Sequence, residues 1–211
     1  MSLKMKLKKL KEVSYKDIPK DMKDTFEQEA EKLAQEKIEE QALKVGDKIP
    51  SFTIKNAVGE IIDSNELLAQ GPLVINFYRG GWWPYCNLEL GSYQEILPDI
   101  QALGGQFVAI SPELPDSSLS LIEKHSLKYE VLSDIENKVA KEFGIVYAIT
   151  DELRSIYKRF GIDLVGLQGN ENYELPVPAT YVVDTNGIII LSYVNSDYTD
   201  RLDPEEVLKV L

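Results

Sequence analysis

The sequence predicts an α/β protein in which a mixed β-sheet is flanked by helices. A strand–helix–strand unit occupies residues 73–111, and its crossover is long enough to join two parallel strands. Two later strands, at 180–183 and 188–194, flank Asn186-Gly187, which is a strong signal for a hairpin between antiparallel strands. We therefore expect parallel and antiparallel strands in one sheet, with the helical segments covering its two faces.

Residues 1–44 are predicted to form an N-terminal tail and helical extension. Residues 1–11 contain five lysines, and we expect a solvated tail there, with binding to acidic lipid or an acidic partner as the alternative. Residues 19–43 are predicted to form one long helix, because apolar residues recur every three to five positions between charged ones. The apolar stripe is thin, so this helix should pack weakly on the domain or pair with a second copy in a homodimer.

Residues 45–211 are predicted to form the main domain. Its strands are expected at 51–56, 73–78, 107–111, 129–132, 180–183 and 188–194, and its helices at 64–69, 84–103, 120–125, 134–143 and 203–211. Ser64 is the expected N-cap of the first of these helices. Residues 147–176 are polar, and we expect them to be irregular.

Composition and charge exclude several classes of function. A net charge of -12 repels phosphate backbones, so we expect no nucleic-acid partner. No apolar run approaches the ~18–20 residues that span a bilayer, and no apolar segment typical of a signal peptide is visible. The single cysteine cannot form an internal disulfide, and with one histidine it cannot supply a zinc site. We therefore expect a cytoplasmic protein with no membrane segment, metal or cofactor.

The one cysteine, Cys86, follows a buried strand and a glycine turn. Gly80 and Gly81 allow the chain to turn after the strand, and Pro84 suits the start of a helix, where its missing N–H costs nothing. Cys86 should then lie in the first helical turn, where the helix dipole and free backbone N–H groups favour a thiolate and lower the thiol pKa. The alternative is a small buried apolar side chain without chemistry.

The segment around Cys86 carries a family resemblance. Phe77–Leu90, which contains Trp82-Trp83-Pro84-Tyr85-Cys86, resembles the active-site segment of peroxiredoxin-like proteins of the alkyl hydroperoxide reductase/thiol-specific antioxidant family. Further similar segments follow in the family's order at 46–52, 109–111, 133–144 and 177–184, so the resemblance covers residues 45–211. It implies a thioredoxin-like fold. It also makes Pro178 the candidate for the cis-proline that many thioredoxin-fold proteins carry.

The match to the family's catalytic residues is partial. Peroxiredoxins carry the pattern P-x-x-x-T-x-x-C with a glutamate three residues further on, and Cys86 and Glu89 fit the last two of these positions. Arg79 stands in place of the proline and Trp83 in place of the threonine, while the family's later arginine would fall at Pro178. Related segments often read W-C-P-x-C. Trp83 also replaces that first cysteine, so CxxC redox cycling is excluded.

The resemblance implies a one-cysteine thiol peroxidase. The Cys86 thiolate would attack the O–O bond of a peroxide substrate and become a sulfenic acid, which an external thioredoxin-, glutaredoxin- or glutathione-like thiol would reduce. Arg79 could supply the positive charge of the missing arginine, the alternative being a surface salt bridge. Glu89 lies one helical turn from Cys86 and could orient Arg79, the alternative being a glutamate favoured only by the helix dipole.

Aromatic residues should line this site, with Pro178 forming its floor. They are Tyr78, Trp82, Trp83 and Tyr85. Two alternatives to the peroxidase remain open: a redox-inactive thioredoxin-fold scaffold that binds a partner, and a degenerate disulfide oxidoreductase. Trp83 distinguishes the peroxidase from the scaffold, because a peroxidase requires that the indole of Trp83 leaves the sulfur of Cys86 reachable.

Overall fold

A mixed sheet lies at the centre of the computed structural model, which describes residues 1–211 apart from the side chain of residue 17. Its strands are β1 Thr53–Asn56, β2 Ile61–Asp63, β3 Leu73–Phe77, β4 Gln106–Ser111, β5 Glu130–Ser133, β8 Ala179–Val183 and β9 Ile189–Val194. They lie in the order β2-β1-β5-β4-β3-β8-β9. The pairs β3–β4 and β4–β5 are parallel and the others antiparallel, which confirms the predicted mixed sheet, crossover and hairpin.

Helices cover both faces of the sheet and enclose two apolar cores. Those of the main domain are α4 Ser64–Gln70, α5 Pro84–Ala102, α6 Pro115–His125, α7 Lys138–Glu142, α8 Asp151–Arg159, α9 Leu164–Gln168 and α10 Glu205–Leu208. Every residue of β3 is buried, and neighbours point to opposite faces. Val74 packs in the core that contains Leu90 of α5, whereas Ile75 packs in the core that contains Leu68 of α4.

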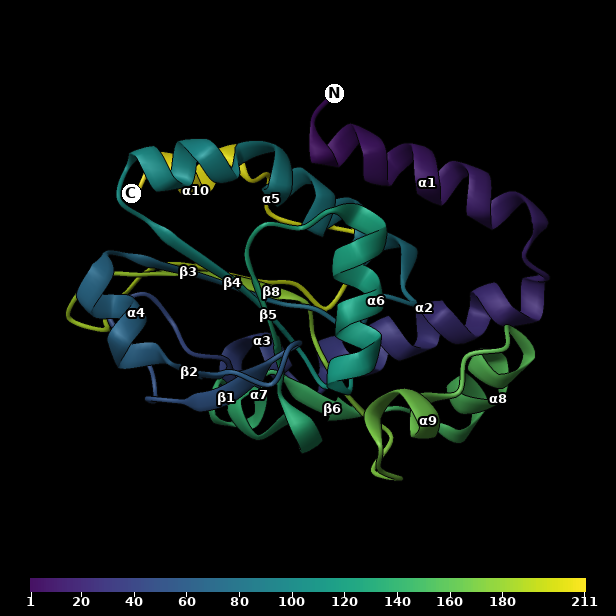
Figure 1. Ribbon diagram of the computed structural model, residues 1–211. Coiled ribbons are helices and arrows are strands. Elements are labelled where there is room, and N and C mark those ends of the chain that lie inside the picture. The colour runs from purple at the N-terminus through teal and green to yellow at the C-terminus, as the bar shows by residue number, and fades with distance from the viewer.

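Residues 3–11 are helical, so the prediction of a solvated tail is wrong. Helix α1 spans Leu3–Asp17 and lies beside α5 on the same side of the sheet (Figure 1). Leu3 and Leu7 are buried one helical turn apart. Lys6 reaches α5, where its Nζ lies 2.8 Å from Glu95 Oε1. The leucines thus provide an apolar stripe that the lysines obscure in the sequence.

Residues 19–43 form two helices, where one had been predicted. Helix α2 spans Lys20–Gln35, and a short helix α3 spans Ile38–Gln41. Between them Lys37 has φ +54°, a left-handed conformation that a continuous helix excludes. Helix α2 packs beside α8 and buries Met22, Phe26 and Leu33, so its packing on the domain is more extensive than its thin stripe predicted. Pairing with a second copy stays a prediction.

Residues 147–176 contain regular structure, so the prediction of an irregular segment is wrong. They include α8, α9 and most of a two-stranded antiparallel sheet of β6 Val146–Ala148 and β7 Glu174–Pro176. Helix α8 begins at a side-chain cap, because Thr150 Oγ1 accepts the Leu153 N–H. Leu153, Ile156 and Tyr157 then form a buried stripe of helical spacing.

Several predicted boundaries differ from the structure. Helix α6 begins five residues before the predicted start, at Pro115, which suits an N-terminal position. Asp63 caps α4 through the Asn65 N–H, whereas the hydroxyl of Ser64 accepts the N–H of Phe52. Residues 134–143 form a 3-10 turn, Ile135–Asn137, followed by α7, and the last helix is confined to α10. In the described part of the chain no helix is long and apolar enough to span a bilayer.

Candidate active site

Cys86 lies in the first turn of α5, as predicted, and has no exposed surface. The chain leaves β3 at Phe77 and turns through Gly80, whose φ of +150° favours glycine. A side chain at Gly80 would collide with the indole of Trp82 and the carboxyl group of Glu113. The turn is therefore closely packed. It starts α5 so that Cys86 lies in the apolar core between α5 and the sheet.

Arg201 is the cation that faces the cysteine, and the sequence analysis missed it. Its Nη2 lies 3.9 Å from Cys86 Sγ, and its Nη1 donates to Glu89 Oε2. Its Nε donates to the carbonyl oxygen of Tyr198 at 2.9 Å, which fixes the guanidinium plane. The loop between β9 and α10 supplies this arginine. No local pattern in the sequence marks it, because folding alone brings it to α5.

Glu89 lies beside Cys86, as predicted, but it orients Arg201 and makes no bond to Arg79 among the described contacts. Its second oxygen, Oε1, accepts from Asn76 Nδ2 of β3 at 3.1 Å. Burial raises the pKa of Glu89, while the ion pair with Arg201 opposes that rise. The carboxylate is therefore held between a strand and the C-terminal loop, and it sets the position of the arginine.

Arg79 is buried, so the alternative of a surface salt bridge does not hold. Its guanidinium lies over three aromatic rings, at 5.0 Å from Tyr198, 5.6 Å from Tyr147 and 5.8 Å from Trp83. Such contacts stabilise a cation that has little water. Arg79 Nε has no hydrogen-bond partner among the described atoms.

The pKa of Cys86 is raised, so the predicted lowering by the helix dipole is wrong in direction. Complete burial is the main cause, and the charge of Glu89 adds to it. Arg201 opposes the rise most strongly, and Arg79 opposes it through its backbone N–H and its guanidinium. In the closed protein the thiol is thus kept mainly protonated, although two cations lie next to it.

Aromatic side chains cover Cys86, and the sulfur is closed to solvent. Trp83 is 6% exposed and packs at 6.2 Å from Phe26 of α2 and at 5.3 Å from Tyr198. Tyr85 completes the cluster, with its ring 5.5 Å from Tyr198 and 6.1 Å from Trp83. The sulfur of Cys86 is therefore not reachable in this conformation, and Phe26 of the N-terminal extension packs on the aromatic cluster that contains Trp83.

Tyr78 and Glu113 form a second buried polar group near the turn. The Tyr78 hydroxyl has no hydrogen-bond partner within the described structure. Burial raises the pKa of Tyr78, and the charge of Glu113 raises it further. Glu113 Oε2 accepts the Gly81 N–H at 2.8 Å. Burial raises the pKa of Glu113 to about 7. No local pattern in the sequence marks Glu113, which lies in the loop after β4.

Pro178 is buried just before β8, but the predicted cis peptide is wrong, because none of the described peptide bonds is cis. Two residues join β7 to β8, and the Val177 N–H bonds to the carbonyl of Ile145. A cis-proline is typical of a tight turn, which this path does not contain. The described residues also include no group of His, Cys, Asp and Glu side chains that could hold a metal ion.

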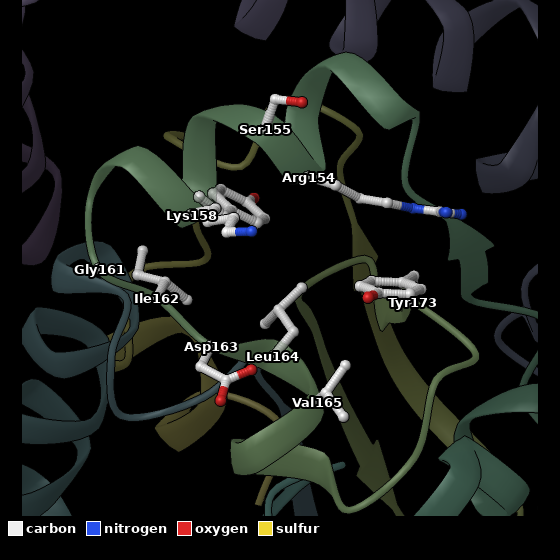
Figure 2. Close-up of a pocket in the computed structure, with 10 residues that line it drawn as sticks. Arg154, Ser155, Lys158, Gly161, Ile162, Asp163, Leu164, Val165 and Tyr173 are labelled. Atoms are coloured by element: carbon white, nitrogen blue, oxygen red, sulfur yellow. The ribbon is translucent and has the colours of Figure 1, made fainter.

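An open cavity of about 540 Å³ lies apart from Cys86, against α8 and α9 (Figure 2). Figure 2 shows Arg154 extending above the ring of Tyr173, and its guanidinium is 4.2 Å from the ring centre. Tyr157 lines this cavity and also packs at 5.2 Å from Trp82. The cavity is thus separated from the cysteine by the aromatic layer, and the cysteine itself defines the candidate site.

Comparison with known proteins identifies the family. Residues 45–192 match the model of the AhpC/TSA family. The chain belongs to the AhpC/TSA family. Chloroplastic peroxiredoxin Q of Populus jackii is 28% identical over 162 residues, which cover 77% of this chain and 65% of that protein. The Gentiana triflora protein is also 28% identical, over 77% of this chain and 64% of its own length. The chain thus spans just under two thirds of these AhpC/TSA relatives.

Solved structures of AhpC/TSA relatives confirm the thioredoxin-like fold. Peroxidoxin BcpB of Mycobacterium tuberculosis superposes with a TM-score of 0.63 at 20% identity, over 80% of this chain and 96% of that one. A yeast mitochondrial 1-Cys peroxiredoxin gives a TM-score of 0.61 at 18% identity, over 80% of this chain and 74% of that one. At these identities the likeness concerns the fold.

Proposed function

We propose that this AhpC/TSA protein is a one-cysteine thiol peroxidase that reduces hydroperoxides through Cys86. The observation that carries the proposal is the contact between Cys86 and Arg201, with the guanidinium 3.9 Å from the sulfur at the start of α5. A guanidinium in this position stabilises a thiolate and can also donate to the oxygens of a peroxide. Family membership and the peroxiredoxin relatives support the same chemistry.

The closed conformation is interpreted as the resting state. Burial keeps the pKa of Cys86 raised there. When the aromatic cover moves and water enters, the burial penalty falls while Arg201 stays hydrogen-bonded to Glu89. The thiol pKa then falls, and the thiolate forms when the sulfur becomes reachable. Activation and access are thereby coupled to one movement.

The reaction has two stages, in which the peroxide oxidises Cys86 and external thiols then reduce it. The Cys86 thiolate attacks one peroxide oxygen, the O–O bond breaks, and Cys86 becomes a sulfenic acid while the leaving oxygen takes up a proton from water as an alcohol or water. An external thiol then attacks the sulfenic sulfur, releases water and forms a mixed disulfide. A second external thiol displaces the Cys86 thiolate and carries away both electrons as a disulfide.

The reductant has to come from outside, because the chain contains one cysteine. We propose a thioredoxin-, glutaredoxin- or glutathione-like thiol. The yeast 1-Cys peroxiredoxin that shares this fold is resolved through glutathione/thioredoxin systems. A cytoplasmic location is part of the proposal and rests on the lone cysteine, whereas the peroxiredoxin Q relatives are chloroplastic.

A redox-inactive scaffold is the second candidate, and one observation favours it. Cys86 has no exposed surface, and the buried Trp83 stands where related segments carry the first cysteine of a CxxC pair. If the cover never opens, the buried thiol is only an apolar side chain in the core of a binding protein.

Intact mass after brief exposure to stoichiometric hydrogen peroxide separates the two candidates. The peroxidase gains one oxygen within seconds, Cys86→Ser gains none, and added dithiol restores the original mass. Oxidation no faster than that of free cysteine would falsify the peroxidase and leave the scaffold. Reduced glutathione and a thioredoxin system, tested separately on the oxidised protein, then identify the reductant.

A further inference from the structure

A small cavity lies between the N-terminal extension and the candidate active site. The volume that the centre of a water molecule can occupy is about 10 Å³, so the cavity has room for one water. Its walls come from α2, α8 and the loop that precedes Arg201, and Phe26 and Tyr198 belong to them. These two residues also pack against Trp83, so the cavity adjoins the aromatic cluster at the start of α5, three residues before Cys86.

Two buried polar side chains in the cavity wall have atoms without partners. Glu29 Oε1 and Arg79 Nε make no hydrogen bond within the described part of the chain, although Glu29 is 6% exposed and Arg79 is 2% exposed. The other oxygen of Glu29, Oε2, is used, since it accepts from Thr150 Oγ1 at 3.1 Å. Buried polar atoms normally find a partner, in protein or in an enclosed small molecule. The cavity thus offers an acceptor and a donor.

Arg79 connects this cavity to the cysteine. Its guanidinium lines the cavity, while its backbone N–H and its charge both act on the Cys86 sulfur. A molecule held between Glu29 and Arg79 would therefore contact a side chain that itself acts on the nucleophile. Glu29 belongs to α2, so the N-terminal extension, which lies before the residues that match the family, contributes directly to this space.

We infer that this cavity is an entry site for hydrogen peroxide, which it holds between the Glu29 carboxylate and the Arg79 guanidinium on the way to Cys86. The inference rests on the proposed peroxidase function and specifies its substrate. Hydrogen peroxide both donates and accepts hydrogen bonds and is little larger than water, so a slight widening admits it. Bulky organic hydroperoxides have no room there, because apolar side chains close the cavity.

Filling the cavity tests the inference. Ala30 lines it on α2, and Ala30→Leu places three more carbons in the space. Ala34 is exposed on the same helix, so Ala34→Leu makes the same chemical change outside the cavity. Stopped-flow fluorescence of Trp82 and Trp83 follows the oxidation of Cys86. We expect Ala30→Leu to slow the reaction with hydrogen peroxide about tenfold or more, and Ala34→Leu to match the wild type.

A second variant keeps the test valid if Ala30→Leu is poorly folded. Glu29→Leu preserves the volume but removes the acceptor, and we expect the hydrogen peroxide rate to fall several-fold. The wild type should also react far more slowly with cumene hydroperoxide than with hydrogen peroxide. An unchanged hydrogen peroxide rate in the folded cavity variants, or equal rates for the two peroxides, overturns the entry site while the peroxidase stands. A wild type inert toward both peroxides overturns the peroxidase, and the entry site with it.

Discussion

Arg201 Nη2 lies 3.9 Å from Cys86 Sγ, although 115 positions separate the two residues in the chain. The family's arginine was expected at Pro178, which carries no charge. The C-terminal loop instead brings a guanidinium to the sulfur, and Glu89 holds it there. The site therefore has a cation beside its cysteine despite the changed positions around it.

Arg201→Met should raise the pH at which Cys86 becomes reactive. The opposite charge favours the thiolate, and its loss moves the midpoint of the pH profile upward by about one to three pH units. Oxidation rates by hydrogen peroxide across pH 5–10 measure this midpoint. Arg159→Met is the matched control, since Arg159 is 57% exposed in its pair with Asp21. A midpoint that stays in place in Arg201→Met would show that this guanidinium does not act on the thiol.

Local sequence signals predicted the parts of the fold that depend on neighbouring residues. Pro84 marked the start of α5 and so placed Cys86 in its first turn. Asn186-Gly187 marked the β8–β9 hairpin, although the ladder there also contains an irregular step. In both cases the backbone preference of one or two residues fixes the element, and the tertiary structure agrees with it.

Long-range packing decided what the sequence could not predict. Arg201, Glu113 and Glu29 reach the site from three separate segments, and nothing near them in the sequence indicates a buried charge. The prediction of a lowered pKa for the Cys86 thiol was wrong for the same reason. Helix position favours a thiolate, but the covering layer of Trp83 and its neighbours removes water, and burial outweighs the local effect.

Glu113 should make stability depend on pH. Burial raises its pKa from an ordinary 4.5 to about 7, so the folded protein holds this proton more tightly than the unfolded chain. The resulting stabilisation is complete below pH 4.5 and is lost as the pH rises through 7, by about 3 kcal/mol in all. Urea unfolding of the wild type and Glu113→Gln from pH 4 to 8 measures it. The wild type should lose stability relative to the variant over this range, and a constant difference would contradict the raised pKa.

Leu7→Ala should destabilise the protein, because α1 is part of the core. Leu7 is 3% exposed in the helix that packs on α5. Removing such a side chain costs about 2–5 kcal/mol, through lost burial and the cavity it leaves. Met5→Ala is the control on the same helix, since Met5 is 59% exposed. Urea unfolding curves for both variants decide the matter, and equal midpoints would restore the solvated tail.

Trp83→Ala should open Cys86 to thiol reagents. The indole is 6% exposed, stands three residues before Cys86 and packs against Phe26 of α2, so we expect its removal to leave a path for a molecule such as DTNB. Loss of a large buried aromatic also lowers global stability, by about 3–5 kcal/mol, and unfolding alone would speed labelling.

Phe107→Ala controls for this loss of stability, because Phe107 is 5% exposed and packs elsewhere, against Tyr93 and Tyr129. We expect labelling in Trp83→Ala to exceed that in Phe107→Ala by about tenfold or more when the two are compared at equal unfolding free energy, since each 1.4 kcal/mol of local opening is worth that factor. Equal rates would mean that Cys86 is reached only by global unfolding, and the scaffold function would then explain the closed site better than the peroxidase.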